Sequence, residues 1–122
     1  ISLVTGYFVH AADLAGPAKE FNLAYLWSVR VNKEFTNQVN EEKELGLPLT
    51  KHMMGLEDPK IMAKNEIGFM KFVIKPLWET VNDYTNWAMK IASDHVEMNI
   101  SEWEKRFKEA QEHEEKQNAG KQ

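Results

Sequence analysis

Apolar side chains at helical spacing between Pro17 and Leu45 constrain the fold of this chain more than any other feature. One face recurs there at steps of three and four residues, formed by Phe21, Tyr25, Ser28, Val31, Phe35 and Val39, as on an α-helix. Pro17 suits a first helical turn because its missing N–H needs no partner there, and Gly46 is a typical residue just beyond a helix end. We therefore expect one helix over 17–45, whose apolar first half is buried on two sides.

Helices are also predicted before and after this segment. Residues 1–13 carry many apolar and almost no charged side chains, which predicts a buried helix that ends at Asp13. A stretch punctuated by proline and glycine over 46–59 is expected to be a loop. A helix over 59–75 should follow, with a kink or a new helix at Pro76, because proline cannot continue the backbone hydrogen-bond ladder.

The C-terminal third is expected to hold a further apolar stripe and a polar tail. Apolar residues at helical spacing continue to about Ala92. We expect a connector over 94–99, and Ser101 has the spacing to cap a last helix. The segment 111–122 is almost wholly polar and is expected to fray. Because no strand pattern is found, the predicted fold class is all-α, with residues 1–110 as one unit.

The composition excludes several classes of function. The chain has 122 residues, 43% hydrophobic and 28% charged, as in an ordinary folded protein. Its net charge of -4 gives no electrostatic footprint for nucleic acid. The absence of cysteine excludes a disulfide framework and a zinc ribbon, and it fits a reducing, cytoplasmic compartment. The most apolar window, 67–78, contains two lysines and is too short to span a membrane.

Asp13 is the first candidate for chemistry. A carboxylate at the end of a buried helix has few neighbours to neutralise it, and a divalent metal is one solution. A turn carboxylate without a ligand is the alternative. His10 lies one helical turn earlier and could face the same side, but a packed or hydrogen-bonded histidine is the simpler interpretation. The other histidines, His52, His95 and His113, show no metal-ligand spacing.

Several short motifs follow one another along the chain. They are His10-Ala11-Ala12-Asp13, Pro17 with Lys19, Trp27 with Arg30, Val31, Glu34 and Phe35, Gln38 with Glu42, Glu44 and Gly46, Leu47-Pro48-Leu49, Ile67-Gly68-Phe69, Pro76-Leu77-Trp78, and Asn99 with Trp103. Their order and distances resemble the C-terminal portion of the class I 3',5'-cyclic-nucleotide phosphodiesterase catalytic domain. The resemblance implies a multi-helix, HD-type fold and a missing N-terminal part of the same domain as partner. Such a partner would cover helices that are apolar around almost their whole circumference.

By this resemblance, Asp13 is the C-terminal ligand of a tightly bound zinc, with magnesium or manganese as the second metal. Metal-bound hydroxide would attack the cyclic phosphate. The family's other ligands and its histidine acid lie upstream, outside this chain. No catalytic residue besides the metal ligand is therefore expected in this fragment.

The resemblance also implies a pocket for the base of a cyclic nucleotide. Phe69 matches the aromatic that stacks on the purine, and Val31 and Ile67 match the apolar residues around it. Their spacing alone would be explained equally well by helix-core packing. The family's base-reading glutamine is replaced by Glu66, which as a carboxylate can only accept hydrogen bonds. The other departures from the family pattern are Gly16 for asparagine, Ala15 for serine and Val39 for glycine.

Three functions are compatible with these residues. The first is metal-dependent hydrolysis of 3',5'-cyclic nucleotides to 5'-monophosphates, cyclic AMP or cyclic GMP, by a larger chain with an altered purine pocket. The second is a degenerate relative that serves as a scaffold or cyclic-nucleotide sensor in a larger cytoskeletal or signalling assembly, with other protein subunits. The third is a helical interaction module that shares only the fold, which explains the motifs poorly. Asp13 and Phe69 favour the first, whereas Glu66 and Gly16 favour the second.

Overall fold

The computed structural model describes residues 2–121 of the chain. In this part every regular element is a helix or a helical turn, and no strand is present. The α-helices are α1 (Leu3–Asp13), α2 (Phe21–Glu44), α3 (Pro59–Phe69), α4 (Lys75–Tyr84) and α5 (Lys90–Ala119), and the shorter turns are η1 (Gly16–Ala18), η2 (Lys51–Met53) and the π-type turn η3 (Met70–Ile74). The predicted all-α fold is confirmed.

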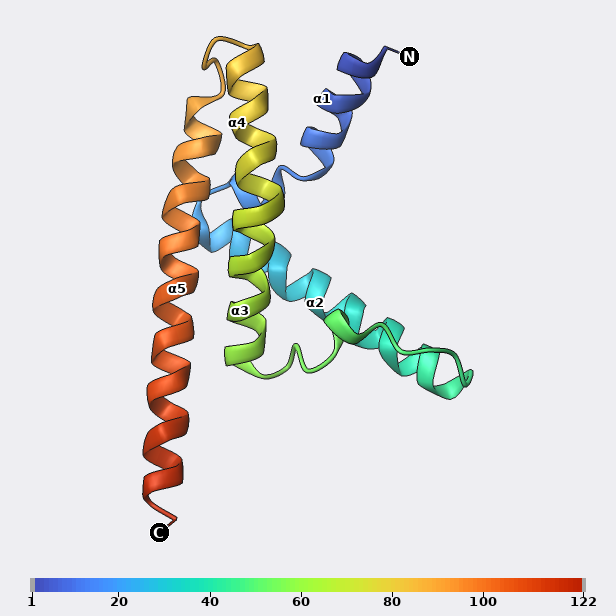
Figure 1. Ribbon diagram of the computed structural model, residues 1–122, viewed down its shortest axis with the longest axis vertical. Coiled ribbons are helices and arrows are strands. Elements are labelled where there is room, and N and C mark those ends of the chain that lie inside the picture. The colour runs from blue at the N-terminus through green and yellow to red at the C-terminus, as the bar shows by residue number, and fades with distance from the viewer. Residues whose placement is uncertain (1, 122) are drawn as a thin grey trace.

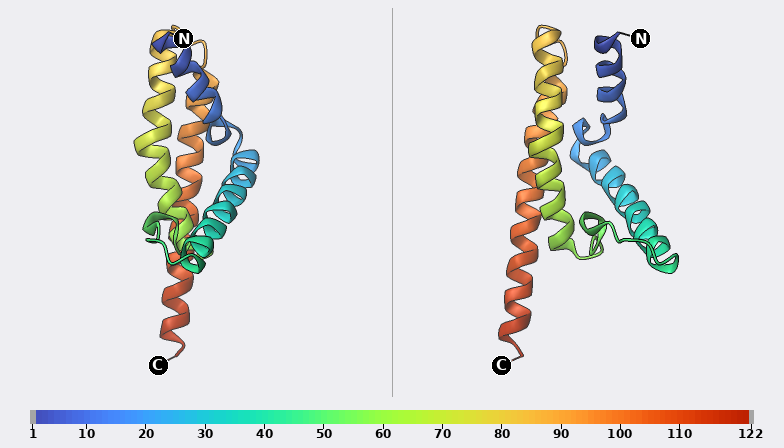
Figure 2. Two further views of the ribbon diagram at one scale, coloured as in Figure 1. Left: turned by 90° about the vertical axis from the view of Figure 1, so that its right-hand side faces the viewer. Right: turned by 45° about the vertical axis from the view of Figure 1, so that its right-hand side comes forward.

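Figure 1 shows that α3, η3 and α4 follow one another as a single rod, here called the α3–α4 rod, which runs antiparallel beside α5. Both views in Figure 2 show α2 leaving this pair at an angle, and α1 packs against α4. Apolar residues of the rod and α5 form most of the core, joined by Ala11 and Ala18; they are Ala63, Met70, Ile74, Leu77, Trp78, Val81, Ala92, Val96, Ile100 and Trp103. The steps of three and four residues explain why both elements are helical.

The solvent side of the same seam carries ion pairs. Lysines of the rod meet glutamates of α5 at 2.6 Å in Lys60–Glu114, Lys71–Glu104 and Lys75–Glu97. Exposed pairs of this kind contribute little stability individually, commonly about 0–1 kcal/mol. The three pairs lie along the same antiparallel seam, and they match the register in which the apolar core packs.

The rod passes through Pro76 without ending. The Lys75 N–H donates to the carbonyl of Met70, five residues back, so the turn before the proline is wider than an α-helical turn. The proline then lies in the first turn of α4, where its missing N–H is tolerated. The predicted discontinuity at Pro76 is present as this wide turn, and the new helix begins at Lys75.

Two predicted helix ends are confirmed. Gly46 has φ +65° and closes α2, because its N–H donates to Lys43 at 3.2 Å while the Leu47 N–H donates to Glu42 at 2.8 Å. This pair of bonds is the Schellman arrangement, for which glycine is the preferred residue. Pro59 begins α3 as expected.

The single helix predicted over 17–45 is wrong at its start. Pro17 opens only the short turn η1, Lys19 is extended at φ -87° and ψ 172°, and α2 begins at Phe21. Burial is also less than expected. Only Ala11 is buried in α1, Leu3 is 90% exposed, and Trp27 of α2 is 53% exposed. The apolar sides of both helices therefore lack a covering element within residues 2–121.

The interruption between the last two α-helices was predicted too late in the chain. α4 ends at Tyr84 rather than near Ala92, and residues 94–99 lie within α5 rather than in a connector. Asn86 and Trp87 turn the chain with φ of 53° and 62°. Ser101 is no cap, because its hydroxyl donates to the Glu97 carbonyl inside α5.

The Asn82 side chain, fully buried, holds the turn between α4 and α5. Its amide nitrogen donates to the Met89 carbonyl at 3.2 Å, and its oxygen accepts from the Met89 N–H at 2.9 Å. Beyond this turn α5 continues to Ala119, with side chains exposed after Ala110. The expected fraying of 111–122 stays a prediction for 111–121, and Gln122 lies outside the described residues.

Candidate functional site

Asp13 is the last residue of α1, and its side chain is exposed. Its carboxylate makes no hydrogen bond or ion pair with any other residue among 2–121. A negative charge at a helix C-terminus meets the negative end of the helix dipole, which is unfavourable by some tenths of a kcal/mol. A cation bound at this position would offset that cost, so the carboxylate suits a metal.

The backbone that follows Asp13 is fastened by side chains from α4 and α5. Trp78 Nε1 donates to the carbonyl of Leu14 at 3.5 Å. His95 Nδ1 lies 3.0 Å from the carbonyl of Ala18, and because a carbonyl only accepts, Nδ1 carries the proton in this contact. The turn after the candidate metal ligand is therefore tied to the core from two helices.

A third fastening comes from Asn99, which is buried on α5. Its amide nitrogen donates to the carbonyls of Pro17 and Lys19, each at 2.8 Å. Both protons of the amide are thereby used, and they hold η1 where the chain bends into α2. Together with Trp78 and His95, Asn99 fixes the direction in which α1 presents Asp13.

His10 is exposed one turn before Asp13. Within residues 2–121, no group of three or more histidine, aspartate or glutamate side chains could hold a metal. Asp13 is therefore a candidate for a single ligand, and the described residues contain no complete metal centre.

The residues expected in the base pocket come from α2 and α3. Val31 on α2 and Phe69 on α3 are each 38% exposed. Glu66 is half-buried and lies three residues before Phe69, so both are on one face of α3. Ile67 is also half-buried, but it packs against the core of the rod and α5. The expected roles of these residues stay predictions.

The side chain of Ser28 on α2 lies near the Glu66 carboxyl on α3. Burial raises the pKa of Glu66 above its ordinary value, and the interaction with Ser28 opposes the rise in part. Ser28 is itself buried and lies three residues before Val31, so the two share a face of α2. The structure thereby brings the face of Ser28 and Val31 toward the face of Glu66.

Sequence reasoning missed the polar character of this face of α2. Ser28 belongs to the predicted apolar face, and Asn32, one turn later, lies outside the residues predicted for it. Asn32 is 9% exposed, and its amide nitrogen has no hydrogen-bond partner among residues 2–121. Two polar residues four apart on a largely apolar helix could have indicated a polar contact at this face. Polar groups are rarely buried without a hydrogen-bond partner.

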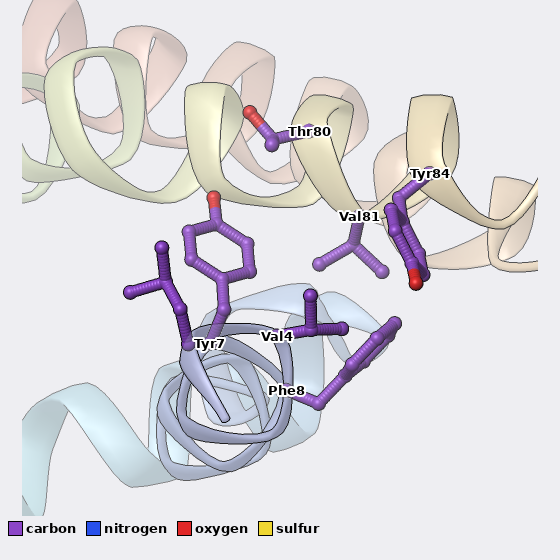
Figure 3. A pocket seen from close by; sticks show the side chains of 7 residues that line it. Val4, Tyr7, Phe8, Thr80, Val81 and Tyr84 are labelled. Atoms are coloured by element: carbon purple, nitrogen blue, oxygen red, sulfur yellow. The ribbon is translucent and has the colours of Figure 1, made fainter. Parts of the chain in front are cut away.

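A separate apolar pocket lies between α1 and α4, shown in Figure 3 with Tyr7 and Phe8 facing α4. The rings of Phe8 and Tyr84 meet edge to face at 5.7 Å. The Tyr7 hydroxyl donates to the Leu77 carbonyl at 3.4 Å and the Thr80 hydroxyl to Pro76 at 2.8 Å. Because no carboxylate or histidine lines it and the hydroxyls of Tyr7 and Thr80 are already paired, this pocket holds no candidate chemistry.

Comparison with known proteins shows to which family this chain belongs. The sequence model of the 3'5'-cyclic nucleotide phosphodiesterase family matches residues 1–96. This chain belongs to that phosphodiesterase family. The predicted resemblance is confirmed.

Relatives of this phosphodiesterase chain include the 3',5'-cyclic-AMP phosphodiesterases 4C of mouse and rat, each 35% identical over 99 residues. That match covers 78% of this chain but only 13% and 17% of the relatives. Two solved phosphodiesterase domains of the rhodopsin phosphodiesterase of the choanoflagellate Salpingoeca rosetta are similar, at 34% identity and TM-scores of 0.83 and 0.85. They are matched over 89% and 93% of this chain and 34% of theirs. The chain thus spans about a third of a phosphodiesterase domain.

No helix within residues 2–121 of this phosphodiesterase chain is both long and apolar enough to cross a membrane.

Proposed function

We propose that this chain is the C-terminal part of an active phosphodiesterase, which hydrolyses 3',5'-cyclic nucleotides to 5'-monophosphates. The observation that carries the proposal is the free carboxylate of Asp13, held at the end of α1 by the fastened turn that follows. Zinc, with magnesium or manganese, would be bound by Asp13 and by ligands outside this chain, and it would supply an activated water for attack on phosphorus. Asp13 contributes the ligand, and Trp78 and Asn99 orient it.

The remaining residues of the site would hold the base. Phe69, with a partly exposed ring, offers a stacking face to a purine, and Val31 offers an aliphatic contact from α2. Ile67 supports the wall from the core side. These residues bind and orient the nucleotide, so that the cyclic phosphate lies toward the metal carboxylate.

The pocket would be altered in which purine it accepts. An ionised Glu66 can only accept hydrogen bonds, and guanine offers two adjacent donors, N1–H and N2–H, whereas adenine N1 offers a lone pair. When Glu66 is ionised, we expect cyclic GMP to be preferred by one to two decades, since an unmatched buried polar group costs about 1–3 kcal/mol.

The test of activity uses the full-length protein. Asp13→Asn keeps the size of the side chain but removes the charge, and it should lower both zinc content and kcat for either nucleotide by at least about 100-fold. The matched control is Asp83→Asn, an exposed aspartate of α4, which should change neither. Full activity and full zinc content in Asp13→Asn would refute Asp13 as a ligand.

The test of base preference is Glu66→Gln in the same protein. Restoring a side chain that both donates and accepts should raise kcat/KM for cyclic AMP relative to cyclic GMP by roughly tenfold or more at alkaline pH. An unchanged ratio in a working enzyme would mean that Glu66 does not contact the base.

A degenerate phosphodiesterase is the second candidate, favoured by Glu66 and by Gly16 in place of the family's polar residues. Its role would be a scaffold or cyclic-nucleotide sensor with other subunits in a cytoplasmic, cytoskeletal or signalling assembly. The sequence upstream of Ile1 separates the two candidates, because an intact set of metal histidines supports the enzyme and their loss supports the scaffold. A full-length protein whose metal sites are occupied but which hydrolyses neither nucleotide would support the scaffold or sensor.

A further inference from the structure

A second pocket, here called the α5 pocket, lies where the start of α2 meets α5. Its volume is about 420 Å³, which is within the range of pockets that hold small ligands or single side chains. It contains none of the residues expected at the metal or at the base. The residues that line it are Glu20, Phe21, His95, Met98, Asn99 and Glu102.

The two neutral polar side chains of the α5 pocket offer it acceptors. Asn99 is 1% exposed and donates both amide protons to backbone carbonyls. Its amide oxygen accepts no hydrogen bond from residues 2–121 and is not among the enclosed atoms, so it is open to the pocket. His95 has its proton on Nδ1 in the contact with Ala18, which leaves a lone pair on Nε2 of the neutral ring.

The two charged side chains of the pocket are carboxylates with accepting capacity to spare. Glu20 precedes α2 and makes no capping hydrogen bond to it. Glu102 Oε1 lies 3.6 Å from Arg106 Nε, which is longer than a hydrogen bond. Arg106 itself does not line the pocket, because its guanidinium lies over the rings of Phe21 and Tyr25. Every polar side chain of the lining is thus an acceptor, and the pocket suits a cation that carries several donors.

The chemistry of the lining favours an arginine side chain over a metal ion. No three histidine, aspartate or glutamate side chains within residues 2–121 are placed to hold a metal. A guanidinium has five N–H donors, against three on an ammonium, and it binds a carboxylate through two parallel hydrogen bonds. Its aliphatic stem packs on apolar surface, which Phe21 and the 67% exposed Met98 provide.

An exposed apolar residue extends this surface along α5. Ile91 is 66% exposed and lies seven residues before Met98, so both are on one face of the helix. The rise of a helix separates them by roughly 10 Å, a length that about three residues of an extended peptide cover. An apolar side chain three positions from the arginine would therefore reach Ile91.

We propose that the α5 pocket is a docking site for a protein partner that inserts an arginine side chain between Glu20 and Glu102. An apolar side chain of the same partner, three positions from the arginine, packs on Ile91. Charge complementarity carries the choice of occupant, since the lining has two carboxylates, two neutral acceptors and no donor side chain directed at it. The proposal does not depend on whether the protein hydrolyses cyclic nucleotides.

The experiment titrates the full-length protein with short blocked peptides that hold arginine and leucine three positions apart, in either order. Carbon-13 NMR of the methionine methyl groups, with the Met98 signal assigned by Met98→Leu, reports occupation of the pocket. At least one peptide should shift this signal saturably. The same peptide with citrulline, which has the shape of arginine without its charge, should bind about tenfold more weakly or worse. Equal binding of the two, or no binding of either arginine peptide, overturns the proposal.

Variants of the protein separate the pocket from its general acidity. Glu20→Gln and Glu102→Gln should each weaken binding of the arginine peptide by about tenfold, because each removes a charged acceptor. Glu109→Gln is the matched control, an exposed glutamate of α5 outside the pocket, and it should leave binding unchanged. Equal effects of the three substitutions would mean that the peptide follows net charge alone, which overturns the site.

A last arm distinguishes a protein partner from a free small cation. Agmatine has the guanidinium and a short aliphatic stem but no apolar anchor for Ile91, so it should bind about tenfold more weakly than the peptide or worse. Ile91→Ser should weaken the peptide and leave agmatine unchanged. Agmatine that binds as tightly as the peptide overturns the assignment to a protein partner.

Discussion

The side-chain amide of Asn99 on α5 donates to the carbonyl oxygen of Pro17 at 2.8 Å, although 82 residues separate the two along the chain. The second proton of the same amide goes to Lys19. Because these carbonyls are bonded to a side chain, they are not used to continue a helix, and the chain can bend between η1 and α2. The contact thereby sets both a helix boundary and the position of the turn after Asp13.

Asn99→Ala should destabilise the full-length protein by about 1–3 kcal/mol, because two carbonyls lose their partner. The free energy of unfolding in urea measures this loss. Asn118→Ala, an exposed asparagine on the same helix, is the matched control and should stay within about 0.5 kcal/mol of the unmutated protein. Equal losses in the two variants would contradict the role assigned to Asn99.

Two glycines should respond oppositely to alanine. At Gly16 the backbone is not left-handed, and an added Cβ would lie 3.4 Å from Trp27 Cγ in ordinary contact. Gly16→Ala should therefore leave stability unchanged or raise it by up to about 1 kcal/mol. Gly55 has φ +74°, and a Cβ there would lie 3.0 Å from Ile61 Cδ1, so Gly55→Ala should lower stability by about 1–2 kcal/mol. Thermal unfolding of both variants checks the contrast, and a loss at Gly16 as large as at Gly55 would refute it.

Glu66 should make the folded state less stable as the pH rises. Its pKa is raised by burial, so the native state binds the proton more tightly than the unfolded state. Its contribution to stability is present below the ordinary glutamic acid pKa and is lost as the pH rises through the higher, native value. The difference in unfolding free energy between the unmutated protein and Glu66→Gln, followed against pH, should fall across this window. A difference that rises with pH would show that the sign is wrong.

The chain expressed alone should not form a well-packed state. Leu3 at 90% exposure and Trp27 at 53% belong to apolar helix sides that no element within residues 2–121 covers. Such surfaces favour molten or aggregated states. Broad amide NMR signals and binding of a hydrophobic dye are expected, whereas sharp and dispersed signals from the isolated chain would contradict this.

The isolated chain should also hydrolyse no cyclic nucleotide when zinc and magnesium are added. It supplies one proposed metal ligand, and no cluster of three is present within residues 2–121. The assay measures release of 5'-monophosphate from cyclic AMP and cyclic GMP. Turnover of either nucleotide, lost again in Asp13→Asn, would show that the chain is sufficient for catalysis.

Local chemistry explains which parts of the fold could be predicted from the sequence. The end of α1 at Asp13, the cap at Gly46 and the start of α3 at Pro59 depend on a residue and its immediate neighbours. The turn at Asn86 and Trp87 has no glycine to mark it, and it forms because Asn82 supplies hydrogen bonds from the buried side. The break before α2 likewise depends on Asn99, which is distant in sequence.

For the candidate site, too, the sequence predicts some features and not others. Asp13, Val31, Glu66, Ile67 and Phe69 could be proposed from motif order, and their environments could not. That Ser28 of α2 lies near Glu66 of α3 depends on how two helices distant in sequence are placed, which no spacing along one helix encodes. The unpaired amide of Asn32 is visible only once its burial is known.

The unbroken passage of the α3–α4 rod through Pro76 sets a length within the proposed site. Phe69, which would hold the base, and Trp78, which fixes the turn beside Asp13, belong to one rod and lie nine residues apart, or roughly 13 Å at the rise of a regular helix. A continuous helical segment fixes the distance between Phe69 and Trp78, whereas a loop would let that distance vary. If Phe69 stacks on the base and Asp13 holds a metal, as proposed, helix geometry sets the span between them, and a residue inserted or deleted in η3 would change the size of nucleotide that fits.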